Sequence, residues 1–465
     1  MDYLDIIKQS LSKEAARLIS VSDKIWDFAE VRYEEKQSSA LMAQTLEDSG
    51  FEVVRNAGGI ETAFVATFGK GQPVVAFLGE YDALPALSQE ANTNCYSPVE
   101  NAGNGHGCGH NLLGTGALAA ALATKACIEE LGLSGTIKYY GCPAEEGGGG
   151  KAFMARAGLF DGVDVAFTWH PWDENLAYNA RMLATNQIKY LFKGKSTHAA
   201  FSPHMGRSAL DGVELMNVGA NFLREHIIPE ARLHYAITNA GGNAPNVVQS
   251  DAHVLYKVRS PKMHQVREIT ERVKDIARGA ALMTGTQVTM EFDAASADLI
   301  PNVTLASMMD EELSKFGPVT FTDEEKAFAQ SIQATFSDEE KRRVEKSGKI
   351  LSEDLTAFRK EPDFLNGSTD VGDVSWLVPV GQVYIATCAW GTAPHSWQMV
   401  TQGKSSYAHK GMLLAGSVIA ASAVRALTNP ALITAAKEEH ILQLEGETYN
   451  SLLPEEAQPR PLNRK

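Results

Sequence analysis

Three apolar, β-rich runs of this 465-residue chain each lead into side chains that can carry chemistry. In chain order, the runs and the side chains that follow them are residues 74–78 with Glu80 and Asp82, residues 136–140 with Glu145 and Glu146, and residues 163–168 with His170. Open α/β sheets place their ligands at the carboxyl ends of parallel strands. A solvated turn explains one such acidic pair, but three strand ends on one sheet edge favour an α/β fold with a functional site there.

The glycine-rich loop at residues 105–114 carries Cys108 and His110, which alternate with glycines. Both side chains can therefore leave one tight loop toward the same point, and a thiolate with an imidazole suits a transition metal such as Zn²⁺. Residues 112–131 are rich in alanine and leucine and predict a buried helix, whose N-terminus favours a thiolate. The alternative is a glycine-rich turn that holds one core cysteine and one surface histidine.

A second glycine run, at residues 147–150, follows the adjacent carboxylates Glu145 and Glu146. Glycines let the backbone approach a ligand closely. Adjacent side chains point in different directions, so one carboxylate can bind a metal while its neighbour faces the substrate. A phosphate-binding loop does not fit, because the first glycine of that motif would fall on Glu145 and an alanine follows Lys151.

Residues 186–293 have a different hydrophobic periodicity. It predicts strands at 187–192, 233–237, 252–259 and 288–292 and helices at 208–226 and 264–283. This β-α-β-β-α-β order predicts a ferredoxin-like α+β domain inserted into the α/β domain. The expected division is residues 1–185, 186–296 and 297–465, the first and last forming one split catalytic domain. The insert carries His198 and Asn246 in two polar loops.

The flanking elements are expected as follows. Helices are predicted at residues 22–31, 36–49, 302–316 and 406–427, solvated helices within 323–349, a polar loop at 366–373, a strand at 382–387 and a surface tail after 429. The strand at 382–387 leads toward His395, in the segment 392–397.

Composition excludes several classes of partner. The formal net charge of −15 argues against nucleic acid and against an anionic membrane. The most apolar late stretch, residues 412–427, is shorter than the roughly 20 residues that a membrane helix needs. No secretory signal is visible at the start, and five scattered cysteines suit free thiols in a reducing cytoplasm.

The potential donors together predict a dinuclear metal centre. One thiolate, one carboxylate and three imidazoles are more than a tetrahedral zinc uses and suit two ions that share a bridging water: Cys108, His110, Glu146, His170 and His395. Glu145 is then left over as the general base for that water. His198 could donate to an oxyanion if the inserted domain reaches over a site, and Asn246 could hold a polar group of the substrate. The predicted chemistry is hydrolysis of an amide.

These motifs resemble the M20 metallopeptidase family, in its amidohydrolase branch. The resemblance rests on Cys108-Gly109-His110, on residues 143–147, on the surroundings of His170 and His395 and on the His198 loop, in the family's order. It implies a mixed sheet covered by helices, an inserted lid that also forms a dimer, and two Zn²⁺ or Mn²⁺ ions on the five donors. It further implies that His198 acts at an active site, either that of its own chain or, as is common in relatives, that of the partner. It implies that Asn246 binds the substrate carboxylate.

The same resemblance implies hydrolysis of an N-acyl amino acid, an aromatic acyl group on glutamate or aspartate. Substrates of the p-aminobenzoyl-glutamate type are expected, with indole-3-acetyl-aspartate or other N-acyl amino acids as alternatives. The partner is expected to be a second copy of the chain or a homologous subunit.

The chain departs from the family pattern at two positions. Many relatives of this branch have an aspartate where Asn111 follows the metal loop. The peptidases of the wider family have a ligand histidine where this chain has Glu80, which makes amidohydrolase activity the favoured expectation. Asp82 is expected to orient a metal ligand by contacting that ligand, without binding the metal itself.

Two rival functions stay open at this point. A weakly active partner subunit would be free to lose the base, whereas this chain keeps Glu145. A cysteine hydrolase using Cys108 and His110 would leave the other donors without a role. Among the remaining residues, His106 is expected to be structural, and tryptophans 169, 172, 390 and 397 are expected either to line an aromatic acyl pocket or to pack in the core.

Overall fold

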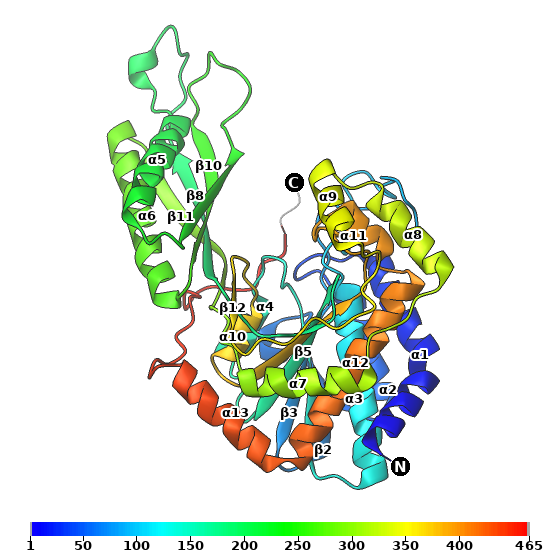
Figure 1. The fold of residues 1–465 in the computed structure, drawn as a ribbon. Helices are drawn as coiled ribbons and strands as arrows, with labels where there is room; N and C mark the ends of the chain where they lie inside the picture. Colours follow the sequence, from blue (N-terminus) through cyan, green and yellow to red (C-terminus); the bar gives the residue numbers. More distant parts are fainter. Residues whose placement is uncertain (1, 463–465) are drawn as a thin grey trace.

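The computed structural model describes residues 2–462, which contain one large mixed sheet, one smaller four-stranded sheet and a two-stranded pair, β7 (Ala180–Met182) with β12 (Asp363–Leu365) (Figure 1). The large sheet has the strand order β1-β2-β4-β3-β5-β13-β6. Its strands are β1 (Glu52–Arg55), β2 (Phe64–Lys70), β3 (Val74–Glu80), β4 (Gly135–Cys142), β5 (Val165–Trp172), β6 (Leu176–Tyr178) and β13 (Val380–Ala386). β3 runs parallel to β4 and β5, and β13 runs parallel to β5, whereas β1, β2 and β6 pair antiparallel. The predicted mixed α/β architecture is confirmed.

Strand β3 shows why the sheet is covered on both faces. All seven of its residues are buried, which is typical of a parallel strand between two layers. Val75 and Phe77 belong to the hydrophobic cluster that contains helices α1 (Tyr3–Phe28), α3 (His110–Leu131) and α12 (Ser406–Thr428). Val74, Ala76 and Leu78 alternate with them and belong to the cluster on the opposite face.

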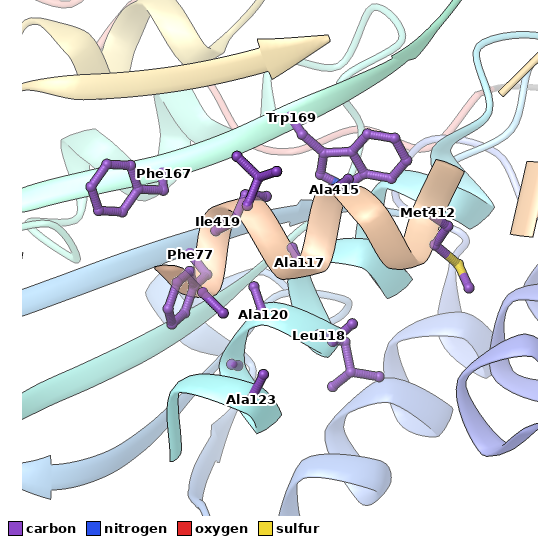
Figure 2. Packing of buried hydrophobic residues seen from close by; sticks show 14 of the residues in the cluster. Phe77, Ala117, Leu118, Ala120, Ala123, Phe167, Trp169, Met412, Ala415 and Ile419 are labelled. Atoms are coloured by element: carbon purple, nitrogen blue, oxygen red, sulfur yellow. The ribbon is translucent and has the colours of Figure 1, made fainter. Parts of the chain in front are cut away.

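Helices α3 and α12 pack against each other in the core (Figure 2). A Cβ on Gly416 would lie 2.7 Å from the Cβ of Ala119, so small residues permit this close approach. By length and composition both helices could cross a membrane, but 89% and 78% of their most apolar windows are buried inside the fold. We therefore interpret them as core helices, and their burial explains their low charge.

The smaller sheet is the predicted βαββαβ unit. Its elements are β8 (Ala184–Lys193), α5 (Ala209–Leu223), β9 (Arg232–Asn239), β10 (Asp251–Ser260), α6 (Met263–Thr284) and β11 (Gln287–Ser296). The four strands pair antiparallel in the order β11-β8-β10-β9, the ferredoxin-like arrangement. Helices α5 and α6 cover one face, and the unit stands out from the larger body (Figure 1). The division of the chain at 185 and 296 stays our proposal.

The remaining elements complete the larger body. They are α2 (Lys36–Asp48), α4 (Gly150–Arg156), α7 (Val303–Phe316), α8 (Asp323–Gln333), α9 (Asp338–Ser347), α10 (Val371–Ser375), α11 (Trp397–Gln402), α13 (Pro430–Gln443), β7 (Ala180–Met182) and β12 (Asp363–Leu365), with three short 3₁₀ turns at 57–59, 203–205 and 224–226.

Three local expectations were wrong. The first helix spans residues 3–28 rather than 22–31, because apolar residues at helical spacing from Ile6 to Ile25 are buried against the core. The tail after 429 begins with helix α13, whose first turn is stabilised by Pro430 and capped by Asn429. The polar loop at 366–373 runs directly into the short helix α10, with Asp370 at its N-cap.

Candidate metal centre

The five predicted donors lie together at one edge of the large sheet, although His170 lies within β5 and not beyond its end. The parallel strands β4, β3 and β5 are neighbours, so their carboxyl ends meet. The Cys108 loop enters α3 beside that edge, and the backbone N–H of His395 donates to the carbonyl of Gly107 at 2.8 Å. Segments that are far apart in the chain are thereby brought to one place.

A third possible group joins His110 with Glu80 and Glu145, but the five predicted donors form two groups that share Cys108. Its thiol lies within 4.8 Å of ligand atoms of His110 and His170 in one group, and of Glu146 and His395 in the other. The Sγ of Cys108 is 3.4 Å from the Nε2 of His170. Two groups of three donors with one shared sulfur are the arrangement expected for two ions held side by side.

Glycines make the two loops of the centre possible. Gly109, at the N-cap of α3, has φ +73°, and a Cβ added at this position would lie 3.0 Å from the Pro171 side chain. A Cβ on Gly150 would lie 1.9 Å from the carbonyl oxygen of Pro143. A side chain at either position would push the loops apart, so the glycines around the donors are required by close packing.

Asp82 fixes the orientation of two donors. Its Oδ1 accepts a hydrogen bond from the Nδ1 of His110 at 2.9 Å, and its Oδ2 accepts the backbone N–H of Glu146 at 2.8 Å. The Nδ1 of His170 similarly donates to the carbonyl of Pro171 at 2.7 Å. Both rings therefore turn their Nε2 atoms toward the cluster, a common arrangement for metal-binding histidines. The contact expected of Asp82 is present, and its effect on metal binding stays a prediction.

A buried ion-pair network behind the donors was not predicted. The Lys151 Nζ lies 2.6 Å from Glu80 Oε1 and 2.5 Å from Asp370 Oδ1, and all three side chains are buried. Burial lowers the pKa of Lys151, but Asp370 and Glu80 outweigh that effect and raise it. Glu80 in turn places its Oε2 3.3 Å from the Nε2 of His110. The glycine run before Lys151 and the polar loop before Asp370 were the available signals, but nothing in the sequence pairs them.

The residues present fit divalent cations. Among the described residues, the buried atoms His110 Nε2 and Glu146 Oε1 make no hydrogen bond. Their charged neighbours are Glu80 Oε2, 3.3 Å from His110 Nε2, and His395 Nε2, 3.3 Å from Glu146 Oε1. Burial, with Glu80 and Glu146 nearby, raises the pKa of Glu145, and burial together with Glu146 raises the pKa of the Cys108 thiol. Unpaired donors and crowded carboxyl groups are both explained by cations, which would hold the thiol and the carboxyls in their anionic forms.

His198 and Asn246 do not lie near this cluster. They neighbour each other, since the backbone N–H of Ala199 donates to the carbonyl of Asn246 at 2.9 Å and His198 bridges Val247. Both side chains are exposed, and their loops lie at the outer end of the smaller sheet (Figure 1). The structure therefore separates these two expected substrate-binding residues from the donors of the same chain.

Comparison with known proteins identifies the family. The peptidase family M20/M25/M40 matches residues 76–373. The chain belongs to this family. It is 46% identical to a subunit of the p-aminobenzoyl-glutamate hydrolase of Escherichia coli, over 98% of each chain. It is 32% identical to the Xaa-Arg dipeptidase of Mus musculus, over 94% of this chain and 92% of that protein.

A solved structure shares the fold. The dinuclear metal binding peptidase YXEP of Bacillus subtilis, also of the M20 family, superposes with a TM-score of 0.56 at 17% identity and covers 90% of this chain and 99% of that one. The family expected from the motifs is thus confirmed, and the chain is an M20 hydrolase.

Two pockets lie near the M20 centre. Lys257 and Arg259 of β10 line a cavity of about 130 Å³ together with Glu145, Glu146 and His395. Aromatic rings line a separate pocket of about 300 Å³: Trp172, Tyr178 and Tyr384. The Tyr384 ring centroid is 5.5 Å from that of His170 and 4.1 Å from that of Tyr178. Cationic side chains therefore line the cavity beside Glu145, and aromatic rings lie next to His170.

Structural contacts explain Trp169, His106 and Asn111. Trp169 is buried in the core and donates to the carbonyl of Leu113 at 2.9 Å, whereas Trp172 lines the aromatic pocket. His106 is buried and its ring contacts the Ile25 carbonyl at 2.9 Å, and burial lowers its pKa to about 4. Asn111 donates to the Ser22 hydroxyl and the Gly403 carbonyl, both at 3.1 Å. Its side chain therefore links α3 to α1 and to the end of α11. All five cysteines are free thiols.

We predict that Asp82→Asn weakens metal binding by about 10- to 100-fold, because an amide NH₂ cannot accept the Glu146 N–H while its oxygen holds His110. Competition with a chromophoric chelator measures the affinity. Asp173→Asn is the matched control, since Asp173 lies near the centre but accepts only the backbone N–H of Gly391. Equal affinities for wild type and Asp82→Asn would contradict the prediction.

Proposed function

We propose that this chain is a dinuclear-metal amidohydrolase that cleaves the amide bond of an N-acyl amino acid with an aromatic acyl group on glutamate or aspartate. The observation that carries the proposal is the pair of donor groups that share Cys108, with the carboxylate of Glu145 beside them. Cys108, His110 and His170 would hold one ion, and Cys108, Glu146 and His395 the other. The ions, Zn²⁺ or Mn²⁺, supply Lewis-acid polarisation and a lowered water pKa when bound.

Glu145 is the general base in this proposal. Its carboxylate lines the small cavity beside the donors, where it can take a proton from the attacking water and return it to the leaving amine nitrogen. Asp82 holds the backbone of the adjacent Glu146, which keeps the two carboxylates pointing in different directions.

Two sets of side chains near the centre support the proposed substrate. Stacked rings of Tyr178 and Tyr384, with Trp172 beside them, suit a flat aromatic acyl group. The cations Lys257 and Arg259, in the cavity that contains Glu145, suit a carboxylate-bearing amino acid.

We also infer that the chain works as a dimer, with a second copy or with a homologous subunit. β9 is an edge strand, and apolar side chains are exposed on it and on the adjacent α5: Val218, Phe222, Tyr235 and Ile237. An exposed edge with apolar neighbours favours pairing with another chain.

This arrangement supports an action of His198 and Asn246 on the partner's site. Arg259 and Asp251 lie eight residues apart along β10, which corresponds to about 26 Å. The loops that carry His198 and Asn246 lie beyond the Asp251 end of this strand. No side chain bridges such a distance within one chain.

The first prediction of the proposal concerns metal dependence. The purified chain with Zn²⁺ or Mn²⁺ is expected to hydrolyse p-aminobenzoyl-glutamate, to lose activity in EDTA and to regain it when metal returns. Indole-3-acetyl-aspartate, assayed beside it, tests the alternative acyl group. Turnover that survives EDTA but is lost on alkylation of Cys108 would favour a cysteine hydrolase. Two bound metals with no turnover of either substrate would favour a different acyl group or a missing partner subunit.

Glu145→Gln is expected to lower kcat by about 10²- to 10⁴-fold, because an amide cannot accept the proton from water. Metal content, measured by atomic emission, is expected to stay unchanged. Glu129→Gln, an exposed carboxylate at the far end of α3, serves as the control. Near-normal turnover of the metal-loaded Glu145→Gln variant would rule out Glu145 as the base.

Mixing two inactive variants tests the action across the dimer. If His198 serves the partner, a dimer of one Glu145→Gln chain and one His198→Ala chain contains one complete site. Mixing and reassembly are then expected to restore up to about a quarter of the wild-type activity, the statistical share of such sites. Activity that stays at the level of the separate variants would place the role of His198 within its own chain.

A further inference from the structure

Lys257 lies on the face of the small sheet that helices α5 and α6 leave uncovered. Residues of β10 alternate between buried and half-buried, and Lys257 and Arg259 share the half-buried face. Both line the cavity beside Glu145 and Glu146. Lys257 also lines the larger cleft that continues along this face between β8, β10 and the main body. It therefore stands where the cleft opens into the centre.

Lys257 lacks a carboxylate partner, unlike Lys193 and Arg32. Lys193 pairs with Asp251, and Arg32 lies 2.8 Å from Asp293. Arg259 donates to the hydroxyl of Ser368 at 2.7 Å. Among residues 2–462, no carboxylate oxygen lies within 4.0 Å of the Lys257 Nζ. Burial and Arg259 lower the pKa of Lys257 to about 8, against the opposing effect of Glu145 and Asp293.

We propose that Lys257 binds the side-chain carboxylate of the substrate's acidic amino acid and so determines the preference for glutamate or aspartate over neutral residues. The inference rests on the proposed function, because the amino-acid half of the substrate must lie on the Glu145 side of the centre. A partly desolvated, unpaired ammonium in the cavity beside Glu145 gains most from an anionic ligand. An uncharged side chain would leave it unpaired, and an arginine would bring a third cation next to Lys257 and Arg259.

The rival role for Lys257 is to offset the charge of the acidic cluster. In that role its loss would change metal content or lower turnover of all substrates alike. Binding of a side-chain carboxylate predicts instead a change in the ratio between charged and neutral substrates. The ratio therefore distinguishes the two roles.

The test compares p-aminobenzoyl-glutamate with p-aminobenzoyl-glutamine, which differ by one carboxylate. Lys257→Met is expected to lower kcat/KM for the glutamate substrate by about 30-fold or more, mainly through KM, and to change the glutamine substrate by less than about 3-fold. Lys189→Met is the matched control, a lysine of the same sheet face that lines the larger cleft and not the small cavity. An equal loss for both substrates, or an unchanged ratio, would overturn the inference.

Calorimetric binding of the free products separates this inference from the proposed function. The wild-type chain is expected to bind glutamate more tightly than glutamine, and Lys257→Met is expected to abolish that difference. If neither amide is hydrolysed but the Lys257-dependent preference is present, the proposed function fails and the inference stands. If both amides are hydrolysed and the preference is absent or persists in Lys257→Met, the function stands and the inference fails.

Discussion

The parallel pairing of β3 with β4 and β5 is the constraint on which the rest of the structure depends. Its register sets Glu80 opposite Cys142, three residues before Glu145, and sets Phe77 opposite Phe167, three residues before His170. Parallel strands need a crossover connection, and α3 is the crossover from β3 to β4. The helix must begin at the edge where β3 ends, so the loop with the shared thiol lies there as well.

The acidic groups at that edge must also be paired or hydrogen-bonded, because a buried carboxylate without a partner is destabilising. Lys151 neutralises Glu80 and Asp370 by pairing with both. Asp82 is stabilised by the two hydrogen bonds that it accepts, from His110 and from the backbone of Glu146. Among the described residues, the donor atoms His110 Nε2 and Glu146 Oε1 at the centre make no hydrogen bond. The apolar helices α3 and α12 exclude water behind them, which strengthens each of these electrostatic contacts.

The sequence could predict the parts that local pattern encodes. Glu146 and His170 stood out because each followed an apolar run, and Cys108 and His110 because they alternate with glycines. The βαββαβ unit stood out through its change of periodicity. The structure brings the donors together and confirms the mixed fold. Lys151 and Asp370 could not be paired from sequence, since 219 positions separate them. Lys257 looked like an ordinary polar position of an alternating strand, because only the packing of the unit against the body turns that face inward.

The residues proposed to bind substrate lie at the two ends of the smaller sheet. The inner end of β10 presents Lys257 and Arg259 to the centre of its own chain, whereas the outer loops carry His198 and Asn246 away from it. If those loops complete the neighbour's site, each centre is whole only in the assembled pair, and activity depends on protein concentration through the dimer equilibrium. A fully active hydrolase and a weakly active single chain are then the same protein in two states of assembly.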